Sequence, residues 1–539
     1  MKKIFLILIL VLSALLRFWN LGSYPSLNAD EAAIGYNAYS LIQTGMDEHG
    51  NKWPIQFQSF NDYKPGFYFY LVLPFVKVFG LNEWAVRIPS ATLGVLSVLV
   101  IYLFVKELFN NERLGLISSL FLAISPWHIH FSRGGWEVNV ATFFILLGMW
   151  LLIKATKNKK YYIYGLIPLI LSLYTYHAAR IIAPLLGLGY LIFFWKSIKN
   201  NLKHFLIALG ISLMVLIPLG IDMVKPDAIS RVAGVGLFAD IGPINRINEQ
   251  RGQHADIQSI PAKILHNKFV NYGLEFFENW LEHYHGLFLF VSGDEIQRNK
   301  VPETGQMYLY CAVLLVIGLW EIFKNGDKGW KIVLWWLVFA PVAAALTFQS
   351  PHALRAQNMV IPLNIISAYG CLQILSWLEK NKNKFITMSG KILLGLVIIL
   401  GFARYQHMYW VHMAKEYPYS SQYGIKELVN YLSENQEKYN KVYITERYDQ
   451  PYILFLFYMK YSPLKFQDNH ALTARDIYGF STVRYFDKYN FEMVDFEEIK
   501  SQNPNSLIIG TEEEIPVEAN IVKTIYFPGS QIAFRIVAN

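Results

Sequence analysis

Long, nearly uncharged apolar blocks recur along the first three quarters of this chain. The blocks at 4–16, 141–153 and 392–402 lie within stretches that approach the roughly 20 residues needed to cross a bilayer. Only 16% of the 539 residues are charged, against about 25% in soluble domains. The pattern excludes a single soluble globule, a disordered chain and a fibrous repeat. It predicts an α-helical polytopic membrane protein.

The blocks predict eleven membrane spans. The N-terminal segment resembles a signal peptide, with Lys2 and Lys3 at its positive end, but no small-residue cleavage site follows, so we interpret it as an uncleaved first helix. The stretch 67–79 is short, aromatic-rich and contains Pro74, which favours a helix lying on the outer membrane face. The ten further spans are expected near 84–106, 114–127, 138–156, 161–176, 180–196, 203–221, 306–323, 331–347, 357–378 and 388–408.

Basic residues in the loops predict the orientation. The N-terminus and the short loops on its side of the membrane hold 18 Lys and Arg, whereas the short loops of the other side hold only Arg133, Arg180 and Arg355. Because cytoplasmic loops are enriched in Lys and Arg, we expect a cytoplasmic N-terminus and an extracytoplasmic C-terminus in the plasma membrane. No basic helix carries interleaved aromatic residues, which argues against a nucleic-acid partner despite the net charge of +8.

The predicted organisation has two domains. Residues 1–410 form a transmembrane catalytic domain that includes outer loops at 20–83 and 222–305, and residues 418–539 form a small extracytoplasmic α/β domain, here called the C-terminal domain. Its composition is that of a water-soluble protein. A helix is expected where apolar residues recur at helical spacing, and strands where β-branched and aromatic residues alternate. These signals are Ile425, Leu428, Val429 and Leu432 for the helix, and KVYIT, SLIIG and QIAFRIV for the strands.

Polar residues gather in the loops that are predicted to face outward. Ionisable groups beside hydrocarbon are costly and usually mark a site or an ion path. The outer loops together contribute acids and bases, so we expect one polar cavity that opens outward. Its candidate residues are Asp30, Glu31, Asp62, Lys64, Arg133, Glu137, His177, Arg180, Asp294, Arg298, His352 and Arg355.

A cavity of this composition suits transfer from a lipid phosphate. A carboxylate can accept a proton from an acceptor hydroxyl, and Lys or Arg can hold the departing phosphate. Glycosyl transfer also needs stabilisation of an oxocarbenium-like transition state. Structural interpretations remain open for four residues. Asp30 could only cap the following helix, Glu137 could only complement a helix dipole, and Lys64 and Arg355 could extend to lipid headgroups.

Metal and cofactor chemistry has little support in the sequence. His128 and His130 have no carboxylate nearby in sequence, and Cys311 and Cys371 both lie in apolar segments. The sequence therefore predicts no cofactor, no disulfide and no resident metal, and leaves a requirement for a divalent cation open.

Two stretches of the first outer loop and second span stand out: LNADEAAIGYNAYSLIQTGMDEHG and NDYKPGFYFYLVLPFVKVFGLNEWAVRIPSATLG. They resemble the corresponding region of family 39 glycosyltransferases. This family belongs to the GT-C superfamily, which includes protein O-mannosyltransferases and the lipid A aminoarabinose transferase. Its second acidic region is similar to AISPWHIHFSRGGWEVN, and bacterial members resemble SGDEIQRNKVPETGQMYLY and SPHALRAQNMVIP. The resemblance covers about residues 1–410 and implies a GT-C fold with about eleven transmembrane helices.

The resemblance also implies roles. Asp30 would be the catalytic base with Glu31 as its companion, and Glu137 would be a second acidic residue near the acceptor or the sugar. Lys64 would contact the lipid phosphate, although Gly66 stands where aminoarabinose transferases have a second proline.

Two further details qualify this assignment. The basic residue that commonly follows the Asp-Glu pair is replaced by Ala32 and Ala33. Arg298 and Arg355 are added as phosphate ligands on charge and predicted topology.

The leading hypothesis is an inverting, metal-independent transferase that moves a sugar from a polyprenyl-phosphate donor to a hydroxyl of a protein, lipid or envelope glycan on the outer face. The alternative is a transporter or flippase of a lipid-linked or polar substrate. A transporter should bury charges at mid-span and show duplicated halves, whereas the acidic motifs here lie at span ends. A non-catalytic glycan-binding or assembly protein is a third reading, against which the intact Asp-Glu pair and Glu137 argue.

Overall fold

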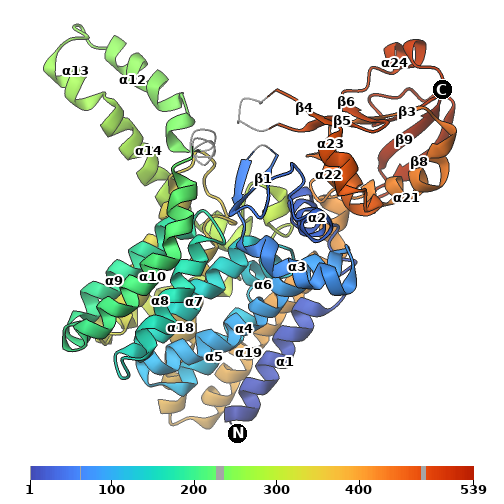
Figure 1. Cartoon of the computed structure of the whole chain (residues 1–539). Coiled ribbons are helices and arrows are strands. Elements are labelled where there is room, and N and C mark those ends of the chain that lie inside the picture. The colour runs from blue at the N-terminus through green and yellow to red at the C-terminus, as the bar shows by residue number, and fades with distance from the viewer. Residues whose placement is uncertain (1, 61, 226–235, 475–480) are drawn as a thin grey trace. The chain divides into compact units, whose positions relative to one another are not determined.

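The computed structural model describes residues 2–60, 62–225, 236–474 and 481–539. The chain divides into two compact units, each assembled from separate segments (Figure 1). One unit, here called the helical unit, contains residues 1–16, 93–131 and 138–405. The other, here called the mixed unit, contains residues 17–92, 132–137 and 406–539. The predicted boundaries at 410 and 418 stay predictions.

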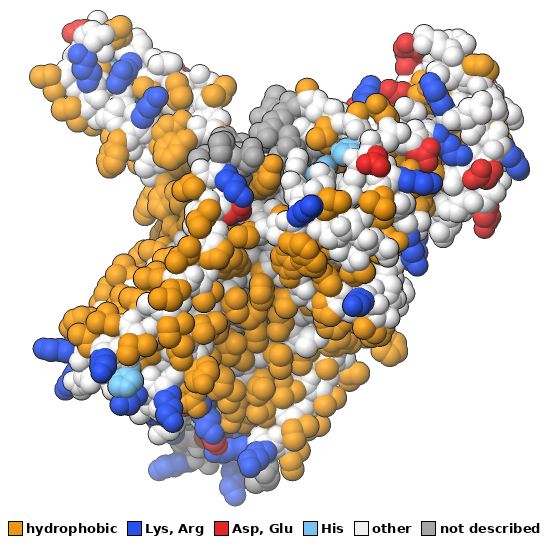
Figure 2. Space-filling model, in the orientation of Figure 1, with side chains coloured by type: hydrophobic (Ala, Val, Ile, Leu, Met, Phe, Trp, Pro, Cys, Tyr) orange, Lys and Arg blue, Asp and Glu red, His pale blue; other side chains and the backbone are white. Residues whose placement is uncertain are grey.

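Long helices make up most of the helical unit. Their apolar side chains cover the surface of the bundle, and Lys and Arg gather at one end of it (Figure 2). Five of these helices, α1, α4, α6, α7 and α19, also contribute one end to the mixed unit. The helices are α1 (Lys2–Phe18), α4 (Glu83–Phe109), α5 (Glu112–Ile124), α6 (Pro126–Ser132), α7 (Glu137–Ala155), α8 (Tyr161–Leu173), α9 (Ala179–Asn200), α10 (Leu202–Met223), α15 (Tyr310–Asn325), α16 (Trp330–Phe339), α17 (Val342–Ala345), α18 (Val360–Lys380) and α19 (Lys384–His407).

Each predicted span coincides with a helix or a pair of helices. By length and composition, six described helical segments can cross a membrane, and the bent pair α5–α6 makes a seventh if it forms one span. The helices α1, α8, α15 and α16–α17 are shorter. A multi-pass helical membrane protein is therefore confirmed, while the count of eleven spans stays a prediction.

Close helix packing in the bundle depends on small residues. Gly370 of α18 lies against the backbone of Leu314 in α15, and Gly318 of α15 lies against the backbone of Ile366 in α18, so neither position has room for a side chain. Short interhelical distances of this kind are typical of small residues in membrane bundles.

Short elements form the predicted outer loop at 222–305 and the turns between helices. Within that loop, residues 226–235 lie outside the described part. The elements are η2 (Leu237–Ala239), α12 (Gly242–Gly252), α13 (Ile260–Leu265), α14 (Lys268–Glu282), η3 (Leu287–Val291), η4 (Gln297–Asn299) and η5 (Gln357–Met359).

The C-terminal domain contains a mixed seven-stranded sheet of order β4-β5-β6-β3-β7-β9-β8. The central strand β3 is parallel to β6 and β7, and the other pairs are antiparallel. The sheet and its helices, shown in orange and red in Figure 1, confirm the predicted α/β fold. The strands are β3 (Lys441–Thr445), β4 (His470–Leu472), β5 (Val483–Phe486), β6 (Tyr489–Glu492), β7 (Ser506–Gly510), β8 (Ile521–Tyr526) and β9 (Ile532–Ala538).

The sequence signals in this domain correspond to observed elements. KVYIT, SLIIG and QIAFRIV fall on β3, β7 and β9, and the four apolar residues of the predicted helical stripe are all buried on α21. The helical elements that follow α19 are η6 (Met408–His412), α20 (Met413–Glu416), α21 (Ile425–Asn435), η7 (Gln436–Lys438), α22 (Pro451–Met459), α23 (Pro463–Asp468) and α24 (Phe496–Gln502).

The N-terminal part of the mixed unit carries the Asp-Glu motif. It consists of α2 (Ala29–Thr44), the antiparallel hairpin of β1 (Gln56–Ser59) and β2 (Asp62–Pro65), and α3 (Phe67–Phe79). Helix α2 is buried along most of its length, packed against α3 and α22. The predicted helix at 67–79 is thus present, and its location on the membrane face stays a prediction.

Candidate active site

Asp30 and Lys64 form an ion pair within the mixed unit. Asp30 lies in the first turn of α2, and the Lys64 ammonium reaches its Oδ1 from β2. The Lys64 side chain is 9% exposed and that of Asp30 is 24% exposed. Lys64 also lies 4.7 Å from the centre of the Phe60 ring. The residues predicted as base and phosphate ligand are therefore in contact, and Lys64 is partnered by a carboxylate instead of extending to lipid headgroups.

Asn28 caps α2, so the alternative of Asp30 as the N-cap is wrong. The Asn28 side chain accepts a hydrogen bond from the Glu31 amide at 3.0 Å, and the Glu31 carboxylate accepts one from the Asn28 amide at 3.3 Å. This reciprocal pair is a capping box. The sequence predicts a helix over 31–43 in the first outer loop. The helix starts two residues earlier, at Ala29, which puts Asp30 inside the first turn.

Glu31 and Arg87 form a fully buried, bidentate ion pair. Arg87 Nε and Nη2 each lie 2.7 Å from a Glu31 carboxylate oxygen, and the Gly135 amide donates to Glu31 at 2.7 Å. The remaining Arg87 hydrogens go to backbone carbonyls, including those of Leu21 and Pro25, each at 2.9 Å. Glu31 thus joins α2 to α4 and to the 132–137 segment, which fixes the turn that carries Asp30.

Arg87 is a residue that sequence reasoning missed. It lies one turn into an apolar span, where an unpaired charge is costly. That position alone signalled that a buried carboxylate must lie nearby.

Arg133 is buried among aromatic rings and backbone carbonyls. Its Nε donates to the Tyr409 hydroxyl at 2.9 Å, its Nη2 donates to the Tyr24 carbonyl at 3.0 Å, and its guanidinium lies 4.7 Å from the centre of the Trp410 ring. Glu137, on the same 132–137 segment, is the first residue of α7 and is 8% exposed. That position fits the helix-dipole interpretation as well as the catalytic one, so both stay open.

The C-terminal domain supplies a second partner for α2. Gln422 is buried and accepts a hydrogen bond from the Ala29 amide at 2.6 Å, while its side-chain amide donates to the Asp449 carbonyl. Its backbone has φ of +55°, a left-handed conformation that non-glycine residues rarely adopt. Gln422 thus ties the first turn of α2 to the segment before α21, a contact that the sequence did not predict.

A buried acid lies close to this ion pair. Glu48 is fully buried, and burial together with the adjacent Asp47 raises its pKa to about 8. The Lys64 charge opposes this rise. Burial, and the nearby His470, lower the pKa of His49 to about 3. At neutral pH the acid is mostly protonated and the imidazole is neutral, so Glu48 competes little with Asp30 for the Lys64 charge.

Asp294 and His352 lie in the helical unit. Asp294 is fully buried and accepts hydrogen bonds from the Ile296 amide at 2.8 Å, the Asn299 side chain at 3.0 Å and the Ala353 amide at 2.6 Å. Its distance to His352 Nδ1 is 3.8 Å. Burial raises the pKa of Asp294. These contacts tie together the loop after α14 and the turn before α18.

The other predicted residues of this unit have local partners. Arg355 donates to Thr347 Oγ1 at 2.7 Å, His177 and Arg180 lie 3.2 Å apart, and the Arg298 carbonyl accepts from His130 Nε2 at 2.9 Å. A single cavity that unites all twelve candidates stays a prediction. The side chain of Asp62 lies outside the described part of the structure.

No metal centre is evident in the described segments, where no three His, Cys, Asp or Glu side chains are grouped so as to hold an ion.

Comparisons with known proteins bear on this geometry. Residues 7–174 match the family model described as dolichyl-phosphate-mannose-protein mannosyltransferase. A Bacillus subtilis protein named "Putative mannosyltransferase YkcB" is 28% identical over 165 residues, which are 29% of this chain and 21% of that protein. A second one, "Putative mannosyltransferase YycA", is 30% identical over 150 residues, or 27% and 22% of the two chains. The chain thus matches about a fifth of the length of these curated relatives.

Solved structures match over nearly the whole chain. ArnT from Cupriavidus metallidurans bound to undecaprenyl phosphate has a TM-score of 0.54 at 10% identity, covering 99% of this chain and 97% of ArnT. The Archaeoglobus fulgidus oligosaccharyltransferase tethered to an acceptor peptide has a TM-score of 0.56 at 12% identity, covering 99% and 74%. The chain has the GT-C fold. The resemblance to family 39 glycosyltransferases is confirmed, and the family match spans Asp30, Lys64 and Glu137.

Proposed function

We propose that this chain is an inverting membrane glycosyltransferase. It moves a sugar from a polyprenyl-phosphate-linked donor to a hydroxyl of a protein, lipid or cell-envelope glycan. The observation that carries the proposal is the contact between Asp30 and Lys64, because a carboxylate able to take a proton lies against a cation able to hold a phosphate. The undecaprenyl phosphate bound to ArnT and the acceptor peptide on the oligosaccharyltransferase support the same chemistry.

The ion pair suggests how donor binding prepares the base. While Lys64 holds Asp30, the ammonium stabilises the charged carboxylate and makes it a weaker proton acceptor. A donor phosphate that competes for Lys64 draws the ammonium away, so Asp30 becomes the stronger base only when donor is present.

The reaction itself is a single displacement. The acceptor oxygen attacks the anomeric carbon and forms the new glycosidic bond, its proton passes to Asp30, and the bond between the anomeric carbon and the phosphate oxygen breaks. Polyprenyl phosphate leaves with the bonding electrons and stays beside Lys64. Glu31 does not touch the reacting atoms in this scheme, and it orients the first turn of α2 through Arg87 and Gly135.

Direct assay tests the proposal. Purified protein should convert a polyprenyl-phosphate sugar to free polyprenyl phosphate in the presence of an envelope extract, and the labelled sugar should appear on an acceptor with inverted anomeric configuration. Movement of the intact donor across the membrane of reconstituted vesicles, without release of polyprenyl phosphate, would favour the transporter alternative and contradict the proposal.

We place the enzyme in the plasma membrane with a cytoplasmic N-terminus and an extracytoplasmic C-terminal domain. The 18 basic residues on the N-terminal side of the predicted topology support this orientation. Cysteines introduced in the 154–160 loop should be shielded from an impermeant thiol reagent in intact cells, and cysteines introduced in the C-terminal domain should react. The opposite labelling pattern would invert the topology.

Replacing Lys64 with alanine should impair donor use. The variant loses the cation that holds the phosphate, so we expect the KM for the polyprenyl donor to rise by about tenfold or more, with a much smaller change in the KM for the acceptor. Lys52, an exposed lysine of the same outer loop, provides the matched control as Lys52→Ala. An unchanged donor KM in the Lys64 variant would remove this residue from the phosphate site.

A further inference from the structure

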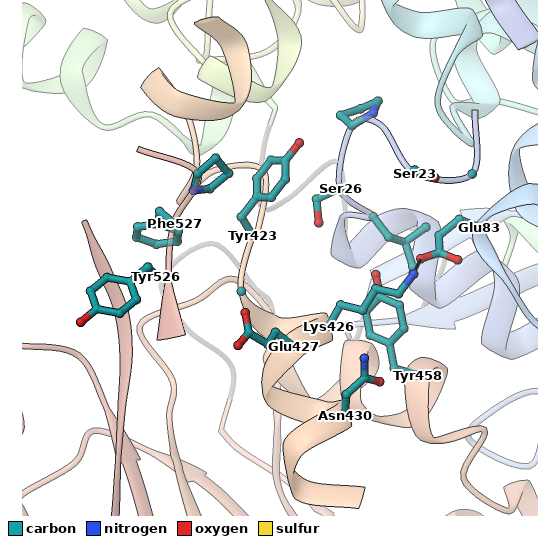
Figure 3. Close-up of a pocket in the computed structure, with 15 residues that line it drawn as sticks. Ser23, Ser26, Glu83, Tyr423, Lys426, Glu427, Asn430, Tyr458, Tyr526 and Phe527 are labelled. Atoms are coloured by element: carbon teal, nitrogen blue, oxygen red, sulfur yellow. Dashed lines mark hydrogen bonds and ion pairs between the residues drawn. The ribbon is translucent and has the colours of Figure 1, made fainter. Parts of the chain in front are cut away.

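A cavity of about 470 Å³ lies within the mixed unit, apart from the Asp30–Lys64 pair. Its size falls within the roughly 300–1,000 Å³ typical of small-molecule sites. Three parts of the chain line it: the 22–27 segment with Glu83, the start of α21 with Tyr458, and the turn after β8. Figure 3 shows Ser23, Glu83 and Tyr458 on one side, Phe527 on the other, and Lys426 between them.

The wall combines aromatic rings with groups that donate and accept hydrogen bonds. The Tyr423 hydroxyl is buried, and burial raises its pKa to about 12, so it stays a neutral hydroxyl at physiological pH. Asn430 and Glu427 project from the exposed face of α21. Aromatic rings beside hydrogen-bonding side chains suit a sugar ring, because its C–H faces pack on aromatic rings while its hydroxyls both donate and accept hydrogen bonds.

The charges of the cavity disfavour an anionic ligand. Lys426 is neutralised by Glu83 at 2.6 Å, and Lys523 is held by Glu427 at 3.0 Å. Among the described residues that line the cavity, Lys426 is the sole cation, against two carboxylates. A donor phosphate would therefore meet one paired lysine and two carboxylates here, which is an unfavourable setting for an anion. A neutral polyhydroxylated ligand meets no such obstacle.

The cavity is also close to the proposed base along the chain. Ser26 lines the cavity and stands four residues before Asp30, so their Cα atoms are at most about 14 Å apart even if the segment were fully extended. Arg87 holds the wall in place by donating to the carbonyls of Pro25 and Ser26. A short oligosaccharide can bridge this distance, with one end in the cavity and its terminal hydroxyl at the carboxylate.

We infer that this cavity binds a neutral oligosaccharide, the part of a glycan acceptor that lies behind the attacking hydroxyl. The role of this saccharide as an acceptor rests on the proposed function, whereas its binding in the cavity does not depend on transferase activity. It narrows the acceptor class from protein, lipid or glycan to a molecule that carries a saccharide chain.

Saturation-transfer NMR and calorimetry on the purified full-length protein test the inference, with mannotriose, maltotriose and N-acetylchitotriose as probes. At least one should bind, and Phe527→Ala and Asn430→Leu should each weaken that binding at least about tenfold, because they remove a stacking face and a hydrogen-bonding amide. Tyr485→Ala is the matched control, since Tyr485 is an exposed tyrosine on β5 outside the cavity and should leave binding unchanged. Thermal unfolding checks that the variants fold.

The outcomes separate the inference from the proposed function. Binding of none of the three sugars, or equal affinity in wild type and both cavity variants, would overturn the saccharide site even if donor turnover is normal. Sugar binding that both cavity variants lose supports the site even if no polyprenyl phosphate is ever released, in which case only the transferase proposal fails. Asp30→Asn should bind the sugar as the wild type does, whether or not polyprenyl phosphate is released, because Asp30 does not line the cavity.

Discussion

Asp30→Asn should lower turnover by about two orders of magnitude or more while leaving the protein folded and able to bind donor. General-base catalysis typically contributes about 10²–10⁴-fold, equivalent to about 3–5 kcal/mol of barrier. Asparagine keeps the shape of the side chain but cannot take up the acceptor proton. The helix should persist, because Asn28 and Glu31 form the capping box of α2 without Asp30.

Lys64→Ala is the informative comparison for this variant. Both substitutions break the same ion pair, so any effect of the broken pair on folding is common to them. We expect Asp30→Asn to act on kcat and Lys64→Ala to act mainly on the donor KM. Near-normal turnover of purified Asp30→Asn would show that the base is another residue.

Arg87→Met should be the most destabilising single substitution among the residues discussed. It leaves the Glu31 carboxylate buried without its guanidinium partner, and breaking a buried pair from one side typically costs about 3–5 kcal/mol. The free energy of unfolding in detergent, measured by thermal or denaturant titration, should fall by that amount. The yield of folded protein should fall with it.

The chain offers an exposed Arg–Glu pair as a control. Arg113 and Glu379 also form a bidentate pair, with distances of 3.0 and 2.7 Å, but their side chains are 47% and 38% exposed. Arg113→Met should therefore change stability by less than about 1 kcal/mol. Replacing Glu31 and Arg87 together with methionine should recover part of the loss, since no charge is then left buried. Equal effects of Arg87→Met and Arg113→Met would contradict the structural role assigned to the buried pair.

Local patterns in the sequence predict most of the fold. The length of the uncharged apolar blocks identifies the helices of the bundle. The period of the apolar residues identifies the α21 stripe and the strands β3, β7 and β9, because each of these patterns reports a face that one element buries. Helix boundaries are less well predicted. Helix α2 begins before its expected start because Asn28, which the periodicity does not register, closes its first turn.

The candidate site is also predicted only in part from the sequence. Asp30 and Lys64 are identified by a motif whose spacing spans one loop, and the structure brings them into contact. The partners that orient them are remote: Arg87 is 56 residues from Glu31, and Gln422 is 393 residues from Ala29. No local pattern links such pairs. Nor does sequence distinguish a carboxylate that faces substrate from one like Asp294, which binds the amides of its own and a neighbouring loop.

The hydrogen bond from the Ala29 amide to Gln422 has a consequence for recombination between relatives. A chimera with its crossover near residue 417 would take Gln422 from one parent protein and α2 from the other. The two contacting surfaces would then no longer match. The natural block for exchange is the discontinuous set 17–92, 132–137 and 406–539, which forms one compact unit. Substitutions near Gln422 and in the first turn of α2 should therefore co-vary among relatives, although 393 residues separate Ala29 from Gln422.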